Sequence, residues 1–147
     1  QTRTDSPAYD SRSIGMIDAV QNVPYLDVIS SLAGDGSRLY IICINKHFDS
    51  PIRAVIRVRG LVPRDSGTAW TLTGTAIDAH TGTTPLQLPG LQLAGPARDS
   101  QNSRFDQGGP DEVQFTSSDV PISGPSFQYT FPPHSVTSLM LSRADSD

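Results

Sequence analysis

The sequence predicts an all-β fold: a two-layer antiparallel β-sandwich of jelly-roll or immunoglobulin-like type, with little or no helix. Three observations predict it. There are about seven or eight short apolar or β-branched runs, turn signals separate them, and no segment combines helix caps with an apolar stripe. Gly and Pro, 12 of each, supply the turns such a fold needs. The 147 residues suit one domain with a single core.

The first half of the chain predicts a lead-in followed by a hairpin. Residues 1–22 are polar without a steady period, so we expect an extended lead-in, with the sandwich formed by residues 23–147. Residues 25–30 predict a strand, and Gly34-Asp35-Gly36 predicts a turn because these residues tolerate positive φ. The second arm, residues 39–44, is apolar at every position. It therefore predicts a central strand that is covered on both sides.

Further strands are expected along the rest of the chain. Residues 52–59 alternate between apolar and mostly charged side chains, which predicts a strand with one buried face. Strands are also predicted at residues 68–75, 113–115, 127–131 and 136–141, and Phe127, Tyr129 and Phe131 should share one face. Residues 78–110 are rich in Gly, Pro and polar residues. We expect a short strand or hairpin within them and mobility in residues 94–109.

Charge and hydropathy exclude several classes of partner. The net charge of −4 and pI of about 5.2 argue against nucleic acid or an anionic membrane, because both require a concentrated positive surface. Arg53, Arg57 and Arg59 fit the solvent face of a strand. No apolar run approaches the roughly 18 residues that span a bilayer. We expect a soluble chain and leave its compartment open, secretion included. Cys43, flanked by isoleucines, is expected to be a buried and inert thiol.

Residue types that carry chemistry are sparse. Glycoside hydrolysis needs two facing carboxyl groups, but the chain has one glutamate, Glu112, and most of its aspartates lie in expected turns and tails. His47, His80 and His134 are isolated, without partners at metal-ligand spacing. No nucleophile elbow or phosphate-binding glycine loop occurs. We therefore predict no catalytic, cofactor-binding or metal-binding residue and no cofactor. A triad assembled from distant residues stays open.

Short motifs along nearly the whole chain carry a family resemblance. The pair VPYLDV at residues 23–28 and LYIICINKH at residues 39–47 resembles α-L-arabinofuranosidases of glycoside hydrolase family fifty-one. Further matching pieces follow in order: SPAYD (6–10), LTG (72–74), NSRF (102–105), PDEV (110–113) and FPPHSVT (131–137). The chain departs from the family pattern by extra residues between positions 84 and 100.

The resemblance implies a function for the chain as part of a larger enzyme. In that family the matching region is a C-terminal β-sandwich packed on a (β/α)8 barrel, and the catalytic glutamates lie on the barrel. The implied enzyme is a retaining hydrolase that releases terminal arabinofuranosyl groups from arabinoxylan or arabinan. This chain would support the barrel and meet the polysaccharide only indirectly.

Two points remain open at this stage. The alternative function is an independent carbohydrate-binding module with exposed aromatic rings as a sugar platform; the best set is Phe127, Tyr129 and Phe131, although their shared strand face is more typical of a core. The second point concerns the lead-in, whose apolar side chains lie outside the alternating strands and are expected to pack on the partner barrel: Tyr9, Ile14, Met16, Ile17 and Val20.

Overall fold

The structure is a computed structural model and describes residues 1–75 and 113–145. These residues form nine strands and no helix, which confirms the predicted all-β class. The strands are β1 (Ala8–Tyr9), β2 (Val23–Pro24), β3 (Leu26–Leu32), β4 (Arg38–Asn45), β5 (Ile52–Arg57), β6 (Pro63–Gly74), β7 (Val113–Pro121), β8 (Ser126–Phe131) and β9 (Ser135–Arg143). Within the same residues, no helix has the length and hydropathy that a membrane span requires.

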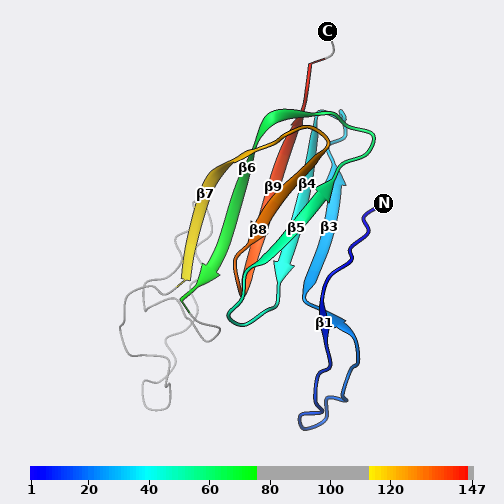
Figure 1. Ribbon diagram of the computed structural model, residues 1–147, viewed down its shortest axis with the longest axis vertical. Coiled ribbons are helices and arrows are strands. Elements are labelled where there is room, and N and C mark those ends of the chain that lie inside the picture. Colours follow the sequence, from blue (N-terminus) through cyan, green and yellow to red (C-terminus); the bar gives the residue numbers. More distant parts are fainter. Residues whose placement is uncertain (76–112, 146–147) are drawn as a thin grey trace, which may run out of the picture.

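Two antiparallel sheets make up the sandwich. The larger sheet has five strands in the order β3-β4-β9-β6-β7, and the smaller sheet pairs β5 with β8. Figure 1 shows β5 and β8 crossing in front of the larger sheet, so the predicted two-layer antiparallel sandwich is confirmed. Two of the four neighbouring pairs in the larger sheet join strands that are not consecutive along the chain, because β9 lies between β4 and β6.

The predicted hairpin is present and its turn has the expected backbone. Strands β3 and β4 pair from Leu26↔Asn45 to Leu32↔Leu39. Gly36 in the connecting turn has φ +70°, a conformation that glycine adopts without steric cost. The Asp35 carboxylate accepts bonds from the backbone N–H and the hydroxyl of Ser37, and the backbone bond is the main cause of the lowered pKa of Asp35. This carboxylate therefore acts as a turn former.

The core lies between the two sheets. Inward-facing side chains of β4 and β9, including Cys43, Leu139 and Leu141, are fully covered. Phe127 and Phe131 on β8 close the core from the smaller sheet, which confirms that they share a buried face. Gly67 on β6 is required by close packing, since a Cβ there would meet the Met140 carbonyl oxygen at 2.7 Å.

Two strand predictions need correction. The expected cover on both sides of residues 39–44 is wrong in the described structure, since Ile42 and Ile44 on β4 keep 37% and 40% of their surface exposed. The strand predicted at residues 113–115 extends to Pro121, because its Ser/Thr-rich continuation pairs with β6 despite having little apolar character. The strand or hairpin expected in residues 78–110, and the mobility expected in residues 94–109, lie outside the described residues.

One buried polar side chain joins the two sheets at the end of β4. Asn45 is 1% exposed, and its Nδ2 lies 2.8 Å from the Pro132 carbonyl oxygen and 3.1 Å from that of Phe131. The same amide nitrogen donates to the carbonyl of Ser50, and Oδ1 accepts the backbone N–H of His47. The amide therefore ties β4 to the start of β5 and to the β8–β9 turn.

The lead-in folds back on itself as an arm, which we define as residues 8–24. Tyr9 pairs with Val23, and Ile14 bridges to Ile17 at the tip. At the base, the Tyr9 ring packs 4.8 Å from Tyr25, which in turn lies 4.6 Å from His47. The arm extends below the sandwich in Figure 1. Ile14, Met16, Ile17 and Val20 are exposed there.

Candidate functional site

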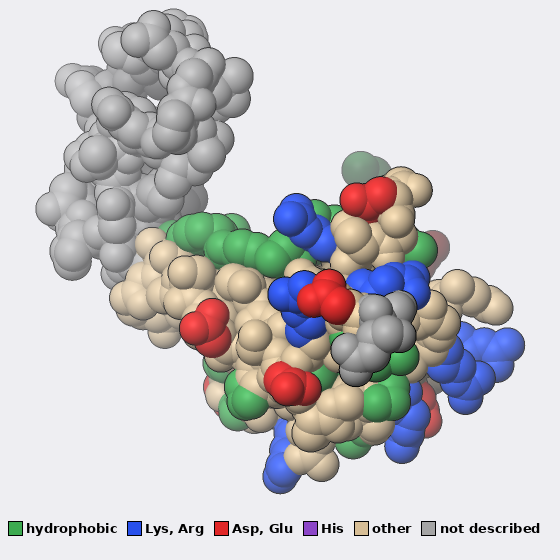
Figure 2. All heavy atoms as spheres, turned by 90° about the horizontal axis from the view of Figure 1, so that it is seen from above, with side chains coloured by type: hydrophobic (Ala, Val, Ile, Leu, Met, Phe, Trp, Pro, Cys, Tyr) green, Lys and Arg blue, Asp and Glu red, His purple; other side chains and the backbone are tan. Residues whose placement is uncertain are grey.

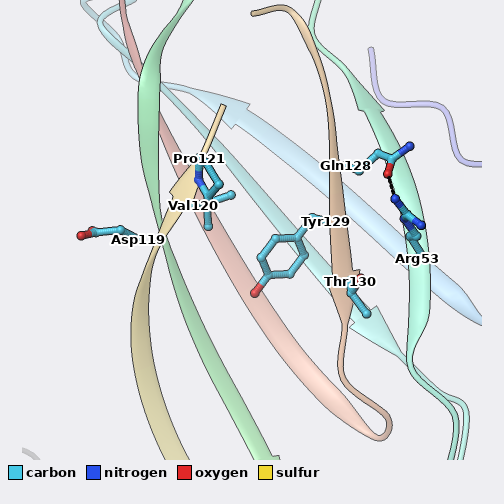
Figure 3. A pocket seen from close by; sticks show the side chains of 7 residues that line it. All are labelled: Arg53, Asp119, Val120, Pro121, Gln128, Tyr129 and Thr130. Atoms are coloured by element: carbon cyan, nitrogen blue, oxygen red, sulfur yellow. Dashed lines mark hydrogen bonds between the residues drawn. The ribbon is translucent and has the colours of Figure 1, made fainter. Parts of the chain in front are cut away.

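A shallow hollow between β7 and β8 is the first candidate for a ligand site. Its volume is about 350 Å³, and its lining includes Arg53, Asp119, Val120, Gln128 and Tyr129. Figure 3 shows the Tyr129 ring pointing into the gap while the Asp119 carboxylate points away from it. Arg53 bonds to the side chain of Gln128 at the outer side of β8. The hollow therefore holds no pair of facing carboxylates, which glycoside hydrolysis requires.

Several of the other described aspartates stabilise turns or form surface ion pairs. Asp10 accepts the backbone N–H of Asn22 at 2.8 Å, Asp49 accepts the hydroxyl of Ser50 at 2.9 Å, and Asp145 pairs with Arg64. Asp5 and Asp65 are exposed. Six acidic residues lie outside the described residues: Asp78, Asp99, Asp106, Asp111, Glu112 and Asp147. Within residues 1–75 and 113–145, no three His, Cys, Asp or Glu side chains form a group that could hold a metal ion.

Two histidines stabilise loops at one end of the sandwich. The ring of His134 lies with Nδ1 2.6 Å from the Phe48 carbonyl oxygen and Nε2 2.9 Å from that of Gly74. His47 Nδ1 accepts the backbone N–H of Ser50 at 3.1 Å. Both rings are therefore occupied by bonds that connect neighbouring turns. His80 lies outside the described residues.

The aromatic set proposed above as a sugar platform belongs largely to the core. Phe127 and Phe131 are 4% and 2% exposed, and Tyr129 is half-buried with its ring edge-on to Phe131 at 4.9 Å. A sugar platform needs an exposed ring face. These three residues do not offer one, so the binding-module alternative loses the residues on which it depended.

Cys43 is buried, as expected, and its environment suppresses thiolate formation. Removal from water raises the pKa of the thiol to about 12, and the charge of Asp27 adds to this effect. Because the thiolate is the reactive form and a rise in pKa from 9.0 to about 12 lowers its fraction at pH 8 about a thousandfold, the folded chain should react with Ellman's reagent about a thousandfold more slowly than the chain in 6 M guanidinium. Absorbance at 412 nm measures both rates. Fast reaction of the folded chain would contradict the assigned environment.

Comparison with known proteins identifies the relatives of this fold. No protein-family model matches the chain. No curated protein matches it either. Among solved structures, the α-L-arabinofuranosidase of Thermotoga maritima in an arabinose complex superposes with a TM-score of 0.68 at 24% identity, over 94% of this chain and 24% of that one. A second arabinofuranosidase gives a TM-score of 0.66 at 25% identity, over 94% and 24% of the two chains.

Other members of the same group agree. The family 51 (GH51) α-L-arabinofuranosidase of Thermotoga petrophila gives a TM-score of 0.64 at 24% identity, over 92% of this chain and 24% of that chain. The GH51 arabinofuranosidase of Xanthomonas axonopodis pv. citri gives 0.59 at 21% identity, over 92% and 21%. This chain thus spans about a quarter of the length of the enzymes it matches. Over nearly its whole length it resembles, in fold, a domain of GH51 arabinofuranosidases.

Proposed function

We propose that this chain is the non-catalytic C-terminal β-sandwich of a GH51-type α-L-arabinofuranosidase, and that it packs against and supports a (β/α)8 catalytic barrel. The observation that carries the proposal is coverage: the match includes 94% of this chain but only 24% of the arabinofuranosidase from Thermotoga maritima. The hollow between β7 and β8 supports the same assignment, because Asp119 is the one acidic residue among the described residues of its lining.

The proposal assigns the chemistry to the barrel. The complete enzyme would release terminal arabinofuranosyl groups from arabinoxylan or arabinan with retention of configuration, through two carboxyl groups about 5–5.5 Å apart on the barrel. The sandwich would contribute packing and meet the polysaccharide only indirectly. The exposed apolar tip of the arm, Ile14 to Ile17, supplies one contact surface for the barrel.

An activity assay tests this assignment. The isolated 147-residue chain should give no release of nitrophenol from an aryl arabinofuranoside above the buffer rate, whereas the natural polypeptide that carries the chain should turn the substrate over. Intact-mass measurement of that polypeptide should show a much larger mass than 15.8 kDa. Turnover by the isolated chain would overturn the non-catalytic assignment.

A second candidate is an independent carbohydrate-binding module with a different platform from the one first considered. Phe115 is 70% exposed. Trp70 on the neighbouring strand β6 lies on the same face of the larger sheet, diagonal to Phe115, because its direct register partner is Ser117. Exposed aromatic rings can stack on sugars. Titration of the isolated chain with arabinoxylan, followed by Trp70 fluorescence, should show no saturable change if the chain is a supporting domain.

A further inference from the structure

The outer face of the five-stranded sheet, the face turned away from β5 and β8, carries an apolar surface. The register aligns three rows of outward side chains across the strands. One row is Ile29, Ile42, Ser138, Trp70 and Ser117; the next is Asp27, Ile44, Val136, Leu72 and Phe115; the third is Ser31, Tyr40, Met140, Thr68 and Asp119. Six large apolar residues of these rows are exposed: Ile29, Ile42, Ile44, Leu72, Phe115 and Val136.

The opposite outer face of the same sandwich is polar. Its strands present Arg53, Val55 and Arg57 from β5 and Ser126, Gln128 and Thr130 from β8. Figure 2, a view from above, shows hydrophobic side chains in a band along part of its upper margin, which is the back of Figure 1, with charged side chains beside the band, and basic side chains projecting from its lower margin. An antiparallel sheet that faces water normally alternates apolar inside with polar outside. The smaller sheet follows this rule, and the larger sheet does not.

We propose that this outer face is the surface on which helices of the catalytic barrel pack, an inference that rests on the function proposed above. A (β/α)8 barrel presents a ring of helices on its outside. Across five strands the face is about 19 Å wide, which matches two helices side by side at about 10 Å each. The charged residues lie at the margins, where Asp27 pairs with Lys46 at 3.0 Å and Asp119 ends a row on β7. The centre of the face can therefore be covered without burying a charge.

The size of the face favours a linked domain over a second copy of the chain. Three rows extend about 14 Å along the strands, so the flat area of the face is roughly 270 Å². This area does not include the additional surface of the protruding side chains. A stable complex between separate proteins buries about 800 Å² on each partner. The smallest interfaces between domains of one polypeptide bury about 300 Å² on each side. So small an area is sufficient because the covalent linkage removes most of the entropic cost of association. A covalently linked catalytic domain is therefore the occupant that this face fits.

Two matched cysteine variants test the assignment. Val136 on the outer face and Val55 on the polar face are 39% and 48% exposed, so Val136→Cys and Val55→Cys make the same substitution at similar exposure. The native Cys43 is buried and adds little background. In the isolated chain, both variants should react with maleimide at similar rates. In the natural polypeptide with its catalytic part, Val136→Cys should react at least about tenfold more slowly than in the isolated chain, while Val55→Cys should keep its rate.

Each other outcome identifies a different error. If Val136→Cys reacts rapidly in a polypeptide that is active on an aryl arabinofuranoside, the face is misassigned and the proposed function stands. If the natural polypeptide has no catalytic part, both proposals fail.

Slow labelling in the isolated chain that speeds up on dilution would identify a second copy as the occupant, and slow labelling at every concentration would mean that the chain covers its own face. Protection of the isolated chain by arabinoxylan would assign the face to sugar binding. Each of these last three results overturns the inference.

Discussion

Asn45→Ala should lower the free energy of unfolding by about 3 kcal/mol, because one substitution removes four hydrogen bonds to buried or partly buried backbone groups. The Asn45 side chain is 1% exposed. Its amide nitrogen donates to the carbonyls of Ser50, Phe131 and Pro132, and its amide oxygen accepts the N–H of His47. Urea denaturation followed by Trp70 fluorescence measures the change. Since this amide connects the two sheets, its loss should also weaken the contact between them.

A second substitution at the same position separates hydrogen bonding from packing. Asn45→Asp keeps the side-chain size but replaces the donating amide by an oxygen that faces the Phe131 and Pro132 carbonyls at 3.1 and 2.8 Å. It should destabilise the chain at least as much as Asn45→Ala at neutral pH. If Asn45→Asp were as stable as the unsubstituted chain, the role assigned to the amide would be wrong.

Leu139→Ala should cost about 2–5 kcal/mol of stability, because it opens a cavity in the centre of the core. Leu139 is fully buried, and its register partners are Ile41 on β4 and Ala69 on β6. Small residues such as Ala69 leave little side chain that could relax into the space. Thermal and urea unfolding should both report the loss.

Leu72→Ala is the matched control, since Leu72 belongs to the same sheet but lies on the outer face and is 44% exposed. Its cost in the isolated chain should stay below about 1 kcal/mol. Equal costs for the two substitutions would contradict the assignment of the inner face as the core. In the polypeptide with a catalytic part, Leu72→Ala should become more costly if the outer face is covered there.

The fold class could be predicted because local residue patterns indicate most of the strands. The alternation in residues 52–59 and the single apolar face of residues 127–131 give β5 and β8 nearly at their observed bounds. The glycine turn between β3 and β4 is equally local, since one residue requires a positive φ. Such signals depend on neighbouring residues only, and a single sequence contains them.

The features that could not be predicted depend on contacts between distant segments. The second half of β7 is a strand because β6 supplies its hydrogen bonds, and Ser117 and Ser118 carry no apolar signal. In the sequence Asn45 is an ordinary residue at the end of a strand, yet two of its hydrogen-bond partners are 86 and 87 residues away. Likewise, the apolar outer side of β4 predicts cover, but one sequence does not show whether that cover comes from the same domain.

The position of β9 has a consequence for how the chain folds during synthesis. Of the strands that the structure describes, β9 is synthesised last, and it is the middle strand of the larger sheet, hydrogen-bonded to β4 on one side and β6 on the other (Figure 1). Until it emerges, the β3–β4 hairpin and the β6–β7 ladder have no partner to join them, and their apolar faces stay open. The sandwich is therefore expected to complete its fold only after β9 has emerged, and loss of residues 135–143 should abolish folding rather than trim one edge.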